Sequence, residues 1–165
     1  MTSGRLPGRP GEYTARASTP DDAAEVAACV DAAYAHYIAR NGLVPGPMRE
    51  DYAAVIRDAQ VTVVQHEGAI VAVLVLAVAG EGFLLDNVAV EPAHQGTGLG
   101  RYLLDYAESE AVRQGFDSIY LYTQEAMTEN LALYERLGYV EYARRAEIGL
   151  SRVYLRKQLA TGAQD

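Results

Sequence analysis

The order of hydrophobic and polar positions along the chain predicts an α/β fold. Apolar residues in short runs or at every second position predict strands at residues 12–18, 61–66, 69–78, 83–90, 118–123, 139–145 and 153–159. Helical spacing marks residues 20–40, 48–59, 101–114 and 128–137. We therefore expect an α/β layer arrangement in which a mixed central sheet of about six to seven strands is flanked by about four helices.

Polar residues and glycines between these segments predict helix ends and turns. Thr19 is the expected N-cap of the first helix, and Gly42 is its expected C-terminal stop. Glu67-Gly68 separates two apolar, β-branched runs, a pattern typical of a hairpin. In the last helix, Thr128 is the expected cap and Gly138 the expected stop.

The pattern contains neither an internal repeat nor a linker between domains, so we interpret residues 12–159 as one domain. Residues 1–11 mix glycine, proline and arginine with little to bury, which predicts a disordered leader. Residues 160–165 offer nothing to pack, and we expect them to form a frayed tail.

Composition narrows the functional classes. The 165 residues carry a net charge of −8, which disfavours nonspecific binding to nucleic acid or to an anionic membrane. No apolar run is long enough to span a bilayer, and the first thirty residues lack the apolar stretch of a signal peptide. The single cysteine, Cys29, excludes an internal disulfide framework, and the three histidines have no metal-ligand spacing. We expect a cytoplasmic protein without a metal.

The segment from Phe83 to Arg101 contains the clearest candidate chemistry. An apolar run, FLLDNVAV, is followed by the turn residues EPAH, the glycine-rich stretch QGTGLG and then a leucine-bearing helical pattern. Glycines at a junction between a strand and a helix let backbone N–H groups approach a ligand, and the helix N-terminus adds partial positive charge. This arrangement suits a phosphate group, although a glycine-rich connection without a ligand fits the same pattern.

Two common phosphate-binding loops do not match this segment. A Walker loop ends in Gly-Lys-Ser/Thr, whereas Arg101 and Tyr102 follow Gly100 here. A dinucleotide fingerprint spaces its glycines as G-x-G-x-x-G, whereas Gly96, Gly98 and Gly100 alternate. The remaining pattern, Gln95-x-x-Gly98-x-Gly100, resembles the pyrophosphate loop of the GNAT acetyltransferase superfamily.

A second segment strengthens the resemblance. The run from Asn130 to Tyr139, NLALYERLGY, is similar to the helix that follows the loop in GNAT sequences, with a helix and a strand between the two as in that family. The resemblance covers roughly Glu12 to Leu159 and is weakest before Val61. It implies a GNAT-like fold, in which the mixed central sheet is mostly antiparallel, and transfer of an acetyl group from acetyl-CoA to a primary amine.

The resemblance also implies roles for individual residues. Asp86 would be the general base, Tyr134 the general acid, and the backbone N–H of Val88 the donor to the developing oxyanion. The implied acetyl-CoA contacts are Val88, Ala89, Val90, Gln95, Gly96, Thr97, Gly98, Leu99, Gly100, Arg101, Asn130 and Tyr134.

The residues alone leave alternatives open. Asp86 fits a structural carboxylate equally well, Tyr134 has the spacing of a core aromatic, Asn130 could cap its helix, and Arg101 could point to solvent. A non-catalytic acyl-CoA sensor and a protein or peptide N-acetyltransferase are the alternative functions. The acceptor could be a small molecule or a peptide amine, and exposed strand edges near the C-terminus are compatible with a homodimer.

Overall fold

The computed structural model describes residues 4–5, 13–42, 44–147 and 149–160. The chain divides into two compact units, one formed by Met1–Leu76 with Asn87–Tyr106 and the other by Ala77–Asp86 with Ala107–Asp165. Most of the predicted leader and residues 161–165 of the predicted tail lie outside the described residues.

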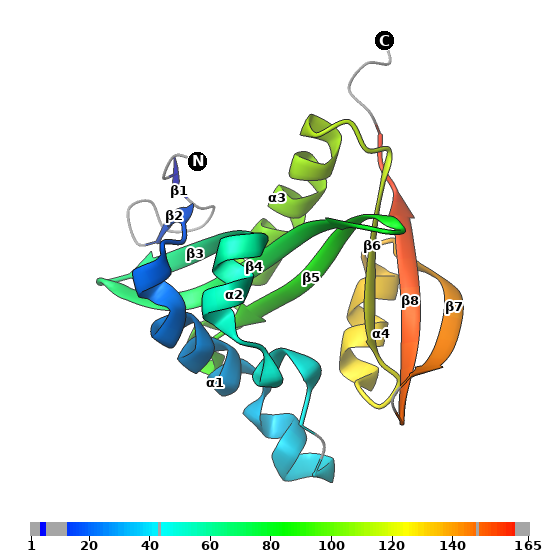
Figure 1. Cartoon of the computed structure of the whole chain (residues 1–165), viewed down its shortest axis with the longest axis horizontal. Helices are drawn as coiled ribbons and strands as arrows, with labels where there is room; N and C mark the ends of the chain where they lie inside the picture. Colours follow the sequence, from blue (N-terminus) through cyan, green and yellow to red (C-terminus); the bar gives the residue numbers. More distant parts are fainter. Residues whose placement is uncertain (1–3, 6–12, 43, 148, 161–165) are drawn as a thin grey trace. The chain divides into compact units, whose positions relative to one another are not determined.

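The first unit combines antiparallel strands with two helices (Figure 1). Strand β1 pairs with β2, β2 with β3, and β3 with β4, all antiparallel. The elements that lie wholly in this unit are β1 (Gly4–Arg5), β2 (Thr14–Ala17), η1 (Pro20–Asp22), α1 (Ala23–Asn41), η2 (Gly46–Arg49), α2 (Tyr52–Asp58), β3 (Gln60–His66) and η3 (Pro92–His94). Strands β4 (Ala69–Ala79) and β5 (Gly82–Val90) and helix α3 (Leu99–Arg113) contribute residues to both units.

One boundary of α1 agrees with the sequence prediction, and one boundary of α2 does not. Gly42 adopts a φ of 72° and donates its N–H to the Ile38 carbonyl, so it ends α1 as expected. The predicted start of the second helix at Met48 is wrong. The Asp51 side chain instead accepts the N–H groups of Ala53 (3.1 Å) and Ala54 (3.5 Å), and α2 begins at Tyr52.

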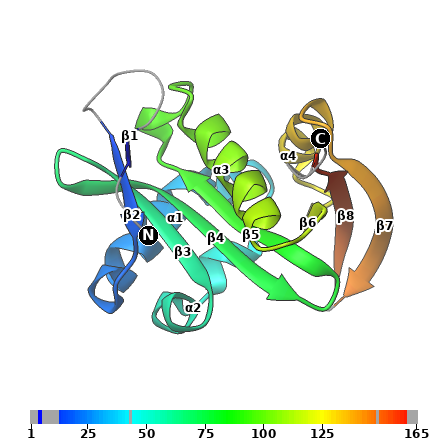
Figure 2. The ribbon, with the colours of Figure 1, turned by 90° about the horizontal axis from the view of Figure 1, so that it is seen from above.

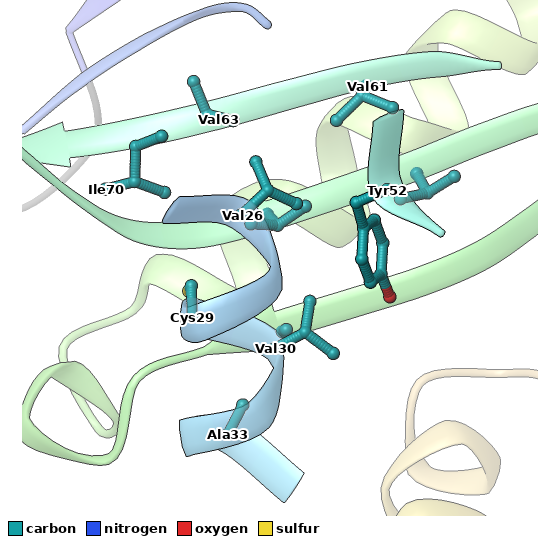
Figure 3. Packing of buried hydrophobic residues seen from close by; sticks show 11 residues of the cluster. Val26, Cys29, Val30, Ala33, Tyr52, Val61, Val63 and Ile70 are labelled. Atoms are coloured by element: carbon teal, nitrogen blue, oxygen red, sulfur yellow. The ribbon is translucent and has the colours of Figure 1, made fainter. Parts of the chain in front are cut away.

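The core of the first unit lies between these helices and the strands. Val26 and Val30 of α1 are fully buried with Val63 of β3, and Tyr52 of α2 is 5% exposed. Figure 3 shows α1, Tyr52 and the strand residues gathered in one apolar cluster. Because these side chains come from both helices and from three strands, their packing holds α1 and α2 on one face of the sheet.

The second unit is formed around β6 (Ser118–Gln124), β8 (Leu150–Gln158) and β7 (Val140–Glu147), with helix α4 (Thr128–Arg136) beside β6 and β8 (Figure 2). Strand β8 pairs antiparallel with both β6 and β7, while β5 pairs parallel with β6 at Leu84 and Tyr120.

One end of α4 differs from expectation. Thr128 is the first residue of α4 and not its cap, because the Met127 carbonyl already accepts the N–H groups of Asn130 and Leu131. Gly138, with a φ of 96°, follows the helix as expected.

Arginines cover the tyrosines on one face of this unit. The Arg145 guanidinium lies 4.3 Å from the ring centre of Tyr154, and that of Arg156 lies 5.2 Å from the ring centre of Tyr120. Both tyrosines are buried, and a cation above an aromatic face is favourable. The long arginine side chains therefore shield apolar surface from water.

Among the described residues, the hydrogen-bonded strand order is β1-β2-β3-β4-β5-β6-β8-β7, and the α-helices are α1 to α4. The pairings of β1 with β2, β2 with β3, β3 with β4, and β8 with β6 and β7 are antiparallel, whereas β5 pairs parallel with β6. The predicted mixed, mostly antiparallel α/β architecture is confirmed, with the two-residue β1 as an addition.

Candidate functional site

Strand β5 has a different side-chain environment on each of its faces. Asn87 and Ala89 are buried, and Ala89 belongs to the cluster formed with α1 and α2. Val88 and Val90 alternate with them and are half-buried. A Cβ placed on Gly100 of α3 would lie 3.9 Å from the Val90 side chain, so the start of α3 packs beside this second face.

The turn after β5 is held by short local hydrogen bonds. The Thr97 hydroxyl donates to the His94 carbonyl at 2.7 Å, and the Gln95 side-chain amide donates to the Val90 carbonyl at 3.1 Å. The His94 ring is also fixed, with its Nδ1 atom 2.9 Å from the Tyr13 hydroxyl. The loop therefore has an ordered base although its glycine-rich end is exposed.

Two glycines give that exposed end its backbone conformation. Gly96 has a φ of 78° and Gly98 a φ of 90°, values that L-residues rarely adopt, and no heavy atom lies within 4 Å of a Cβ built on either. Helix α3 starts directly afterwards at Leu99, which is 3% exposed and anchors the first turn. The Tyr102 N–H donates to the Gly98 carbonyl at 3.0 Å, which is the first turn of the helix.

This loop fits a diphosphate. The N–H groups of the first helical turn have no partner within a helix, and they carry the positive end of the dipole of the 15-residue α3. The open space around Gly96 and Gly98 would let phosphate oxygens approach the backbone. The cluster predicted from sequence, Val88 to Val90 and Gln95 to Arg101, lies together in the first unit.

Arg101, predicted to contact a phosphate of acetyl-CoA, pairs with Asp105 in this structure. Its Nε atom lies 3.4 Å from Asp105 one turn along α3, and both side chains are about two thirds exposed. An exposed ion pair of this kind is weak, so it would not prevent the guanidinium from turning to another anion.

The other predicted residues belong to the second unit. Tyr134, on α4, is 7% exposed and packs edge to face against Tyr139, with ring centres 5.7 Å apart. Asn130 lies in the first turn of the same helix and is half-buried. Asp86 is half-buried on β5, directly before the buried Asn87. The roles predicted for these three residues remain predictions.

A buried polar network beside Val88 was not found from the sequence. The Tyr34 hydroxyl donates to Asn87 Oδ1 at 2.8 Å and lies 3.2 Å from the Val88 carbonyl oxygen. Asn87 Nδ2 in turn donates to the Tyr52 hydroxyl at 3.2 Å. The available signal was a single amide side chain within an apolar strand, because burying such a group requires hydrogen-bond partners.

Cys29 has the environment of a core residue. It is 2% exposed on α1, and burial raises the pKa of its thiol to about 12. A nucleophilic cysteine requires the opposite shift, because the thiolate is the reactive form.

The described part of the chain has neither a cluster of metal ligands nor a membrane-spanning helix. No three His, Cys, Asp or Glu side chains there are grouped so that they could hold a metal ion. No helix in the same residues has the length and apolar character needed to cross a membrane.

A family model and a related protein both identify this chain as similar to acetyltransferases. A family model described as the acetyltransferase (GNAT) domain matches residues 57–141. The [ribosomal protein bS18]-alanine N-acetyltransferase of Escherichia coli strain K12 is 39% identical over 57 residues, which are 34% of this chain and 38% of that protein. The chain thus matches well under half the length of this relative.

Solved structures share the fold over most of the chain. The crystal structure of the ribosomal-protein-S18-alanine N-acetyltransferase from Escherichia coli has a TM-score of 0.68 at 20% identity, covering 93% of this chain and 97% of that one. An acetyltransferase structure from Salmonella typhimurium, solved with acetyl-CoA, also has a TM-score of 0.68, at 21% identity, with 94% and 98% covered. At these identities the likeness shows the fold.

Proposed function

The chain belongs to the acetyltransferase (GNAT) family, and from this premise we propose that it is an acetyl-CoA-dependent N-acetyltransferase. The observation that carries the proposal is the turn between β5 and α3, in which Gly96 and Gly98 open the backbone at the N-terminus of a long helix. Both family membership and this geometry favour a ligand with a diphosphate, which is the part of acetyl-CoA that a helix N-terminus can bind without side chains.

Acetyl-CoA supplies the activated acyl group as a thioester. The loop from Gln95 to Arg101 would hold its diphosphate through backbone N–H groups, and the backbone of Val88 to Val90 would pair with its pantetheine amides in the manner of an added strand. Asn130 is proposed as a further hydrogen-bonding contact. These assignments predict that side-chain changes in Val88 or Val90 act mainly through packing.

Three residues are proposed to act on the reacting groups. Asp86 accepts a proton from the acceptor, because an ammonium with a pKa near ~10.4 must lose one before its nitrogen can attack. The short aspartate side chain favours a relay through one water. The Val88 N–H donates to the carbonyl oxygen as negative charge develops there.

Tyr134 is proposed to give a proton to the departing thiolate. A phenol with a pKa of ~10 is a weaker acid than a thiol of ~8.5, so full transfer is unfavourable in solution. The transfer therefore depends on a fixed position for the hydroxyl, and the burial of Tyr134 on α4 is consistent with such a position.

The acceptor is proposed to be a primary amine that attacks directly, without an acyl-enzyme. The Escherichia coli relative is named for its action on an alanine of a ribosomal protein, and the shared segment supports including peptide N-termini among candidate acceptors. Small amines remain equal candidates. Further parts of the proposal are a cytoplasmic location, no nucleic-acid or membrane partner, and a homodimer that light scattering would detect.

The proposal is tested in two steps. Calorimetry with CoA and acetyl-CoA should show binding to the folded protein, and release of free thiol should then depend on an amine from a panel of small amines and short peptides. Binding without any amine-dependent thiol release would instead support the non-catalytic sensor. No heat with either ligand would contradict the assignment of the loop.

A further inference from the structure

Hydrogen bonds at the end of β5 show which of its backbone groups face β4 and which point away from it. Glu91, directly after β5, donates its N–H to the Val71 carbonyl of β4 at 2.9 Å. In an antiparallel ladder the backbone groups of alternate residues face the same neighbour, so those of Val88 and Val90 point away from β4. Side chains agree with this direction, since Tyr34 reaches the Val88 carbonyl and Gln95 the Val90 carbonyl.

The Tyr34 hydroxyl contacts two consecutive parts of the strand. It bonds the Asn87 side chain at 2.8 Å and approaches the Val88 carbonyl oxygen at 3.2 Å. The peptide N–H of Val88 lies between these two points along the chain. Both sides of that N–H are therefore tied to one hydroxyl, and Tyr34 itself is fixed on α1 beside the packed core.

Asn87 extends the network and makes it costly to disturb. Asn87 is 6% exposed, so an amide left without partners would lose hydrogen bonds that water could not replace. Its Nδ2 donates to Tyr52, whose hydroxyl donates onward to the Pro47 carbonyl at 2.7 Å. The strand is thereby connected to α1, to α2 and to the η2 turn within the first unit.

We propose that Tyr34 and Asn87 are positioning residues that hold the Val88 N–H in the orientation needed to donate to the thioester carbonyl. This inference rests on the proposed function, because it concerns the orientation of the oxyanion donor. Tyr34 and Asn87 act through the backbone of Val88 and do not themselves contact the reacting atoms. A donor that is fixed before the reaction stabilises developing charge better than one that must reorient.

The test compares two ligands that differ only at the acetyl group. CoA lacks the carbonyl that the Val88 N–H would meet, whereas acetyl-CoA carries it. We expect Tyr34→Phe and Asn87→Ala each to weaken acetyl-CoA binding several-fold in calorimetry, while CoA binding stays within about twofold. With a good acceptor, kcat should fall about tenfold, less than the loss typical of removing an oxyanion donor outright.

A core variant separates positioning from general destabilisation. Val30→Ala, one turn before Tyr34 on α1, removes fully buried methyl groups but none of the hydrogen-bonding groups of the network. It should lower thermal stability yet leave the ratio of the two ligand affinities and kcat unchanged. The double variant Tyr34→Phe/Asn87→Ala should be no slower than the worse single variant, because both changes release the same N–H.

The outcomes distinguish this inference from the proposed function. If the wild type binds acetyl-CoA and turns over while Tyr34→Phe keeps its kcat and its relative affinity for the two ligands, the positioning role is wrong and the proposed function stands. Equal losses in Val30→Ala would also overturn it, since general destabilisation would then explain the effect. A wild type that binds acetyl-CoA but transfers no acetyl group would overturn both.

Discussion

The Arg16 guanidinium donates two parallel hydrogen bonds to the Asp22 carboxylate, from Nη1 to Oδ2 at 2.8 Å and from Nη2 to Oδ1 at 2.9 Å. The same carboxylate accepts the Thr19 N–H at 2.7 Å and is only 8% exposed. Paired in this way, Asp22 fastens the end of β2 to the turn that begins α1.

This pair predicts a pH-dependent contribution to stability. The hydrogen bond from Arg16 is the main reason that the pKa of Asp22 is lowered from 3.8 to about 2. Because the folded-state pKa lies below the unfolded one, the contribution is complete above about pH 4 and is lost as the pH falls toward 2. Asp22→Asn should cost about 2 kcal/mol in urea unfolding at pH 7, and its difference from wild type should shrink on acidification.

Asp58→Asn is the matched control for that measurement. Asp58 pairs with Arg57 at 3.1 Å, but both side chains are about two thirds exposed. A pair in this setting contributes little, on the order of 0.5 kcal/mol or less. Equal losses in the two variants would show that the partly buried geometry of Asp22 adds nothing.

Substitution of Gly98 tests the loop assignment. At a φ of 90°, Gly98→Ala should cost about 1–2 kcal/mol in backbone strain, and the altered backbone should weaken acetyl-CoA binding. Gly98→Glu adds a negative charge beside the proposed diphosphate and should weaken binding further. Calorimetry with acetyl-CoA on the folded variants measures both effects.

Gly115→Ala controls for the strain alone. Gly115 has a nearly identical φ of 92° and equally open surroundings, but it follows the other end of α3. It should lose similar stability and keep full acetyl-CoA affinity. If both alanine variants bind acetyl-CoA as tightly as wild type, the backbone of the loop from Gln95 to Arg101 does not bind the diphosphate.

Features that depend on neighbouring residues were predictable from the sequence. The Glu67-Gly68 turn adopts φ values of 52° and 83°, which suit the tight hairpin between β3 and β4. The glycine loop likewise follows its strand and opens its helix as expected. In each case the residues that impose the conformation are adjacent in the chain, so their pattern is sufficient.

Features that depend on distant partners were not predictable. Tyr34 and Asn87 are 53 positions apart, and only the packing of α1 against β5 brings their side chains into contact. Tyr34 therefore had the pattern of an ordinary core residue on an amphipathic helix. The start of α2 has a local cause instead: helical spacing begins at Met48, but the cap that Asp51 provides places the first helical residue at Tyr52.

Cys29 should be unreactive in the folded protein. Burial raises the pKa of its thiol to about 12, so almost no thiolate is present near neutral pH. A disulfide reagent that detects free thiols should react with one thiol per chain in denaturant and with none in buffer. Fast labelling of the native protein would contradict this burial, and it would also add background to assays that detect released CoA.

Tyr134→Phe tests the proposed general acid. Loss of the hydroxyl should lower kcat about 100-fold for an acceptor whose transfer is limited by chemistry, with acetyl-CoA affinity within about twofold of wild type. Tyr120→Phe, another buried tyrosine of the second unit, should keep its activity. An unchanged rate in Tyr134→Phe would mean that Tyr134 is a core aromatic residue and not the general acid.

Asp86→Asn distinguishes an enzyme from a sensor. The substitution keeps the size of the side chain but removes its capacity to accept a proton, so acetyl-CoA binding should persist while kcat falls at neutral pH. As the pH rises toward the acceptor pKa near ~10.4, more amine is already deprotonated, and the difference from wild type should narrow. A constant ratio of the two rates from pH 6 to 10 would mean that Asp86 does not serve as the base, whereas normal binding with no wild-type turnover would identify a sensor.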